Sequence, residues 1–80
     1  MEFYYQIREN GIPFGRYFNG MTPYANDWLP IEGRRIYHNI SACCQDANIL
    51  SEKKSVVVVK RMKLPNGKWK ELPIKVFKKK

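Results

Sequence analysis

The residues best suited to chemistry lie in the last third of the chain, where basic side chains surround a tryptophan. Clustered lysine and arginine bind phosphate groups, and an exposed indole ring can stack on a nucleic-acid base. The sequence around Trp69 has both features. The candidate polyanion-binding residues are Lys60, Arg61, Lys63, Lys68, Trp69, Lys70 and Lys75. This pattern favours nucleic acid, or the acidic surface of a protein, as the partner.

Catalytic and metal-binding patterns are weak by comparison. His38 is the single histidine, and Cys43, the nearest candidate nucleophile, follows it after about a turn and a half of helix. A nucleophile needs a base within hydrogen-bonding distance, and this spacing does not favour one. The acidic residues are scattered, and no glycine-rich phosphate loop occurs. The sequence therefore predicts a protein that is not an enzyme and has no cofactor and no metal site.

The positive charge is distributed very unevenly along the chain. The formal net charge is +8, yet residues 1–52 hold four basic and six acidic side chains, whereas residues 53–80 hold eleven basic side chains and only Glu71 as an acid. A segment of this kind indicates a polyanionic partner. Net charge also promotes solubility by itself, so both interpretations stay open at this point.

The cysteines and the N-terminus bear on the compartment. Cys43 and Cys44 are adjacent, where a disulfide is strained, and two free thiols are typical of a reducing compartment. The N-terminal residues lack the basic and apolar regions of a signal peptide, and the longest aliphatic run, residues 56–59, is too short to cross a membrane. We expect a soluble, cytoplasmic protein that does not bind membranes, with residues 1–80 forming a single domain.

The strongest structural signal is a hairpin at the C-terminal end. A β-branched run opens at Val56, and the turn residues 65–67 separate the predicted strands 56–64 and 68–77. Pairing Leu64 with Lys68 places Lys63 opposite Trp69. One face, predicted to be the core side, then carries Val56, Val58, Met62, Leu72, Ile74 and Val76, with Lys60 and Lys70 near the turn. The other face carries Val57, Val59, Arg61, Lys63, Trp69, Glu71, Lys75 and Phe77. Residues 78–80 are predicted to be a frayed tail.

The preceding part of the chain predicts a second hairpin, a loop and a helix. Residues 3–8 and 12–18 flank Asn10-Gly11, a strong hairpin signal, and Pro13 indicates that the returning strand is an edge. Residues 19–33 are rich in turn signals but include Trp28, so we expect this loop to pack on the core. A helix is predicted from about residue 40 to about residue 52, with Asn39 or Ser41 as its N-cap. Its apolar stripe is Ile40, Cys43, Ala47 and Leu50.

Together these elements predict an α+β fold. The expected architecture is a small antiparallel sheet of about four strands, in two hairpins, with one helix packed on one face and the order ββ-loop-α-ββ. The sequence does not determine which strands meet in the middle of the sheet. Within this framework the basic C-terminal hairpin is the predicted binding element.

A second interpretation is a protein-interaction module, either an inhibitor or an adaptor, that binds an acidic surface of one partner. Small accessory proteins of phages and mobile elements share this size and lack of catalytic motifs, which is an analogy of class only. The candidate interface residues are Tyr24, Trp28, Val57, Val59 and Phe77. Homodimerisation through the second face of the hairpin is a further alternative. Trp69 itself is also explained by packing against the stem of Lys63.

Overall fold

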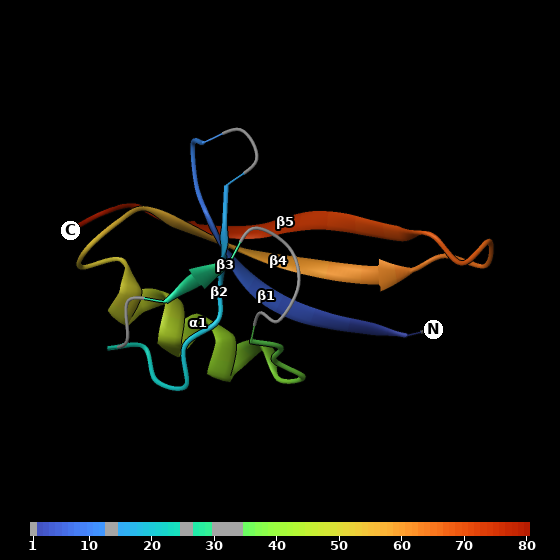
Figure 1. The fold of residues 1–80 in the computed structure, drawn as a ribbon, viewed down its shortest axis with the longest axis horizontal. Coiled ribbons are helices and arrows are strands. Elements are labelled where there is room, and N and C mark those ends of the chain that lie inside the picture. The colour runs from blue at the N-terminus through green and yellow to red at the C-terminus, as the bar shows by residue number, and fades with distance from the viewer. Residues whose placement is uncertain (1, 13–14, 25–26, 30–34) are drawn as a thin grey trace.

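A computed structural model describes residues 2–12, 15–24, 27–29 and 35–80 of the chain. Within these ranges, five strands form one antiparallel sheet in the order β3-β2-β1-β4-β5, and a helix packs against one of its faces (Figure 1). The elements are β1 (Phe3–Glu9), β2 (Tyr17–Phe18), β3 (Trp28–Leu29), α1 (Ile40–Leu50), β4 (Val56–Lys63) and β5 (Trp69–Phe77). The predicted α+β class is confirmed, but the sheet has five strands rather than about four.

The middle of the sheet is the pairing of β1 with β4. These are the first strands of the two hairpins, and Ile7 lies opposite Val58 in an antiparallel register. Val56 to Val59 are all buried, because β4 lies between β1 and β5 and is covered on both faces. The β-branched run thus occupies the position where its side chains lose the most contact with water.

The core lies between α1 and the face of the sheet that α1 covers, which we call the helix face. Ile7, Phe18 and Trp28 pack there against Cys43, Ala47 and Leu50, so Trp28 lies in the core as predicted. Asn39 caps the helix by accepting hydrogen bonds from the backbone N–H groups of Ser41 and Ala42. The helix ends at Leu50, about two residues earlier than predicted, and Ile40 at its first turn is exposed.

The first hairpin is wider than predicted. Arg8 pairs with Tyr17, whereas a two-residue turn at Asn10-Gly11 would have placed Arg8 opposite Pro13. Gly11 does adopt a positive φ of 78°, but the returning strand β2 contains only Tyr17 and Phe18. It is not an edge, since β3 pairs with its other side. Pro13 lies outside the described residues.

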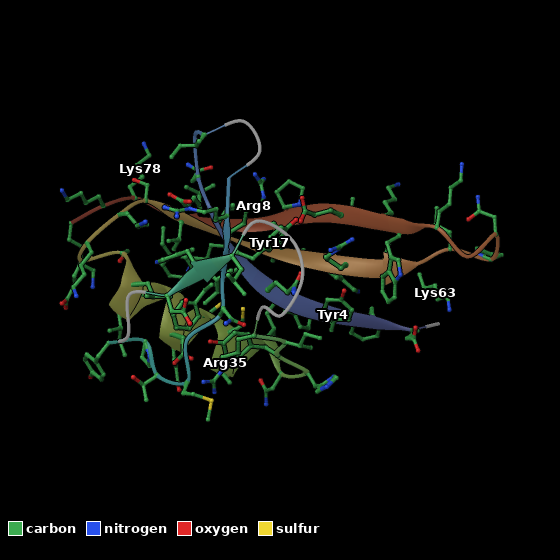
Figure 2. The ribbon with its side chains drawn as sticks, viewed as in Figure 1. Tyr4, Arg8, Tyr17, Arg35, Lys63 and Lys78 are labelled. Atoms are coloured by element: carbon green, nitrogen blue, oxygen red, sulfur yellow. The ribbon has the colours of Figure 1, made fainter. Side chains whose placement is uncertain are left out.

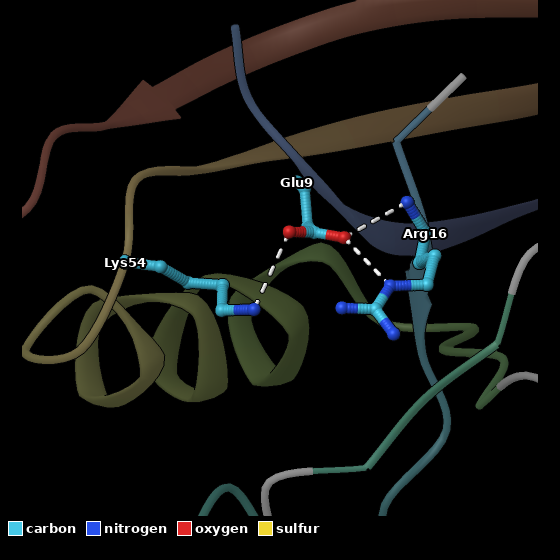
Figure 3. Close-up of polar contacts among 3 residues, drawn as sticks. All are labelled: Glu9, Arg16 and Lys54. Carbon is cyan, nitrogen blue, oxygen red and sulfur yellow. Dashed lines mark hydrogen bonds and ion pairs between the residues drawn. The ribbon is translucent and has the colours of Figure 1, made fainter. Parts of the chain in front are cut away.

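A buried carboxylate explains why the chain takes the wider path (Figure 3). One oxygen of Glu9 accepts hydrogen bonds from the backbone N–H and the Nε of Arg16, both at 3.1 Å, and the other accepts one from the Nζ of Lys54 at 3.3 Å. Burial would raise the pKa of Glu9, but these partners outweigh it and hold that pKa below its usual value. The carboxylate therefore fixes the returning chain at Arg16 and the end of the α1–β4 connection at Lys54.

The second hairpin follows the predicted register only from its turn to the middle. Lys63 lies opposite Trp69 and Lys60 opposite Leu72 as predicted, but a β-bulge between Val58 and Val59 shifts the remainder. Val59 still pairs with Pro73 in the predicted register, whereas the next residue, Val58, pairs with Lys75 rather than with Ile74. A bulge at a proline in an edge strand is expected, because proline cannot donate a ladder hydrogen bond.

The bulge exchanges the two faces of β5 beyond Pro73. Phe77 and Lys75 lie on the helix face, where Phe77 packs against the core, and Val76 lies on the opposite face. Ile74 and Val76 are both exposed. The predictions that Ile74 and Val76 point into the core, and that Lys75 and Phe77 point away from it, are therefore wrong.

The C-terminal tail makes two backbone hydrogen bonds to the rest of the chain. The backbone N–H of Lys79 donates to the Oγ of Ser55 at 2.9 Å, and that of Lys80 donates to the carbonyl oxygen of Ser51 at 3.0 Å. These bonds hold residues 78–80 beside the C-terminal end of α1.

Candidate nucleic-acid interface

The far ends of β1, β4 and β5 project beyond the helix (Figure 1), and we call residues 2–5 and 60–72 the projecting end. The basic side chains after residue 52 divide between this end and the opposite end of the molecule. The projecting end carries Lys60, Arg61, Lys63, Lys68 and Lys70, whereas Lys53, Lys54, Lys78, Lys79 and Lys80 lie near the C-terminal end of α1. Figure 2 shows Lys63 and Lys78 at opposite ends of the protein. The charge therefore forms two groups, with Lys75 between them.

The predicted binding residues also divide between the two faces of the sheet. The pairing places Arg61, Lys63 and Trp69 on the face opposite α1, which we call the outer face. Lys60, Lys70 and Lys75 lie on the helix face, and Lys68 follows the turn. The structure thus brings three of the seven predicted residues onto one surface, and that surface contains the tryptophan.

Trp69 packs against a residue that the sequence argument did not select. Its ring centroid is 5.1 Å from that of Tyr4, with an angle of 51° between the ring planes, and the guanidinium carbon of Arg61 is 5.9 Å from it. Tyr4 belongs to β1 and Trp69 to β5, strands that are about 10 Å apart because β4 lies between them. Both rings must therefore lean across β4. The indole remains 37% exposed.

The acidic residue of the C-terminal hairpin is already engaged. The hydroxyl of Tyr17 donates to one carboxylate oxygen of Glu71, and the Nε of Arg8 is 3.5 Å from the other. Figure 2 shows Arg8 and Tyr17 close together, and the two residues are paired on the neighbouring strands β1 and β2. Burial, together with the hydrogen bond and the charge of Glu71, raises the pKa of Tyr17 to about 12. Arg8 therefore offsets the charge of Glu71 locally, and Glu2 is the other acidic side chain at the projecting end.

The helix face of the projecting end has its own aromatic and basic residues. The Nζ of Lys60 lies 4.3 Å from the ring centroid of Phe3, a side chain that is 43% exposed. Phe3 in β1 and Trp69 in β5 are therefore similarly exposed aromatic residues on opposite faces of the projecting end. Substitutions of these two residues therefore allow the two faces of the projecting end to be compared.

The side chains in the central part of the outer face are buried rather than exposed. Val57 and Val59 are 2% and 0% exposed, so the prediction that they form an exposed surface for a protein partner or a second copy is wrong. Trp28 is buried and Phe77 packs on the core, which leaves Tyr24 as the exposed member of that predicted interface. Gln6, on the same face, is also fully buried, and neither its Nε2 nor its Oε1 has a hydrogen-bond partner among the described residues.

The candidate catalytic residues are not brought together. His38 is exposed, whereas Cys43 is buried in the core, where burial raises the pKa of its thiol to about 12. Among the described residues, no three histidine, cysteine or acidic side chains are grouped as metal ligands would be. Nor does the described part of the chain contain a helix of the length and apolar character that a membrane span requires.

No protein-family model, curated protein or solved structure matches this chain. The geometry of the projecting end is therefore the basis for a functional proposal.

Proposed function

We propose that this protein is a non-enzymatic module that binds nucleic acid through its projecting end. The observation that carries the proposal is a partly exposed indole, Trp69, which shares its face with Arg61 and Lys63. The same projecting end also carries Lys60, Lys68 and Lys70. The one acidic side chain of the hairpin, Glu71, is already held by Arg8 and Tyr17. The basic side chains thus face little competition from within the hairpin when an external anion approaches.

Each side chain has a definite role in this proposal. Arg61, Lys63, Lys68 and Lys70 neutralise backbone phosphates, and Trp69 stacks on a base. Lys63, Lys68 and Lys70 are exposed, so their ammonium groups reach a ligand without a change in the fold. Lys60 and Lys75, which lie over aromatic rings on the helix face, add to the positive potential at longer range.

The experiment is a titration of labelled single-stranded and duplex DNA and RNA at several salt concentrations. Log affinity should fall linearly with log salt, by roughly 0.7 to 0.9 for each phosphate contact. The variant Lys63→Ala/Lys68→Ala should bind more weakly and with a shallower slope. The control variant Lys78→Ala/Lys79→Ala removes the same charge from the opposite end and should bind nearly as well as the wild type.

Two results would contradict the proposal. One is the absence of binding at low salt, and the other is an equal loss in both double variants, because the latter shows a response to net charge rather than to one surface. Circular dichroism of each variant checks that the fold is kept.

A second candidate, an adaptor that binds an acidic protein surface, is favoured by one observation. Ile74 and Val76 are exposed on β5, and the outer edge of β5 carries no paired strand among the described residues. An extended acidic segment could pair there by strand addition. Two copies are less suited to this edge, because Lys70 and Lys75 would repel their counterparts and Pro73 lacks a donor. Pull-down from cell extract with and without nuclease separates the two candidates.

A further inference from the structure

We infer that the nucleic acid is single-stranded and that its bases stack on the outer face of the projecting end, against the paired rings of Trp69 and Tyr4. This inference rests on the proposed function and specifies the form of the ligand and the face that binds it. It is carried by the aromatic pair, by the width of the projecting end, and by the charges around the pair.

The aromatic pair places two rings side by side instead of one isolated side chain. Their centroids are 5.1 Å apart and their planes are inclined at 51°, so the rings present two adjoining surfaces for stacking. Arg61, which lies opposite Tyr4 in the sheet, places its guanidinium 5.9 Å from the indole centroid. A single strand can turn its base faces onto such a surface, whereas in a duplex those faces are already covered by neighbouring base pairs.

The width of the projecting end argues against insertion into a duplex groove. The N-terminal end of the chain runs beside β4 as far as Lys63, the last residue of β4. There the backbone N–H of Lys63 donates to the carbonyl oxygen of Glu2 at 2.9 Å. The DNA major groove accommodates an α-helix or a two-stranded ribbon, and a third strand adds about 4.8 Å to the width. Among the described residues of the projecting end, the turn after Lys63 is the one narrow element that extends beyond the three strands. A surface of this width suits a flexible single strand better than a groove.

The charges on the outer face suit a ligand held by stacking as well as by phosphate contacts. Arg61 and Lys63 flank the aromatic pair, and Glu71 shares that face, although Arg8 offsets the charge of Glu71. This mixed surface provides fewer phosphate contacts than the basic residues of both faces would provide together. The affinity for a single strand should therefore depend strongly on the indole and only moderately on salt.

The experiment compares a single-stranded oligothymidine with a duplex of the same length, using three variants. Trp69→Leu should weaken single-strand binding by roughly 5- to 150-fold, because stacking of one base contributes about 1–3 kcal/mol. Trp69→Phe keeps an aromatic face and should restore most of the affinity. Phe3→Leu removes the similarly exposed aromatic residue of the helix face and should leave the affinity nearly unchanged.

The possible failures are distinguishable. Tighter binding to the duplex than to the single strand, or an equal loss in Phe3→Leu and Trp69→Leu, overturns the inference but leaves the proposed function in place. Failure to bind either ligand overturns both. If Trp69→Leu is misfolded by circular dichroism, tryptophan emission decides the question. A stacked base quenches Trp69, so the single strand should quench the wild type and Phe3→Leu alike, whereas binding without quenching overturns the inference.

Discussion

The fully buried glutamine of β1 provides a sharp test of the fold. Gln6 is 0% exposed and lies opposite Val59 in the centre of the sheet, and its amide has no hydrogen-bond partner among the described residues. Burial of an unpaired amide costs roughly 1–3 kcal/mol in proteins. Methionine has the same unbranched length and no group that requires a hydrogen bond. The variant Gln6→Met should therefore fold more stably than the wild type.

The magnitude follows from the same features. Because the volume is conserved, no cavity opposes the gain, and we expect an increase of about 2 kcal/mol in the free energy of unfolding. For a domain of this size this corresponds to a rise in Tm of roughly 10 °C. Urea denaturation followed by circular dichroism measures the change, provided that the slope of the transition stays constant.

The control is Gln45→Met, which makes the same substitution at an exposed position of α1. It should change the free energy of unfolding by less than about 0.5 kcal/mol. If Gln6→Met instead destabilised the protein by about 1 kcal/mol or more, the amide would have partners in solution, and the described environment of β1 would be incorrect.

Three further predictions concern Glu9, the cysteines and the turn of the second hairpin. Because the folded protein holds the pKa of Glu9 below the unfolded value of about 4.5, its contribution to stability is complete above that pH and is lost as the pH falls through the folded pKa. Urea denaturation across acidic pH should show this loss, and Glu9→Gln should show a smaller dependence on pH. A thiol reagent should modify Cys44 promptly in the native protein and the buried Cys43 only after unfolding; rapid modification of both thiols would show that the core is open. Gly67 has a φ of 84°, so Gly67→Ala should destabilise the protein by about 1 kcal/mol, and an unchanged urea midpoint would contradict the turn geometry.

Two elements of the fold were predictable from the sequence because their signals are local, although the local signal at Asn10-Gly11 gave too narrow a hairpin. The helical stripe from Cys43 to Leu50 and the turn between Leu64 and Lys68 are local patterns, and both are confirmed. The bulge was missed because a proline in a strand permits several registers, and one inserted residue exchanges every later side chain between faces. For this reason Ile74 and Phe77 were assigned to the wrong sides.

The candidate site was only partly predictable because it combines distant segments. The pairing of Lys63 with Trp69 follows from the turn, but the contact of Trp69 with Tyr4 requires knowledge that β1 lies beside β4. The sequence indicates that Tyr4, Gln6 and Arg8 lie on one face of their strand. It does not indicate which strand pairs with that strand in the sheet. Similarly, nothing local predicted that the lysine tail would bond to Ser51 and Ser55 and thus lie away from the projecting end.

The most direct test of the central claim is a map of the binding surface by amide and indole NMR shifts during titration with a single-stranded oligothymidine. We expect the Nε1–H signal of Trp69 to shift together with the amide signals of Tyr4, Arg61 and Lys63, while the Nε1–H signal of the buried Trp28 stays in place. Shifts confined to residues 78–80 and the end of α1, or the absence of any shift, would contradict the claim that the projecting end binds nucleic acid.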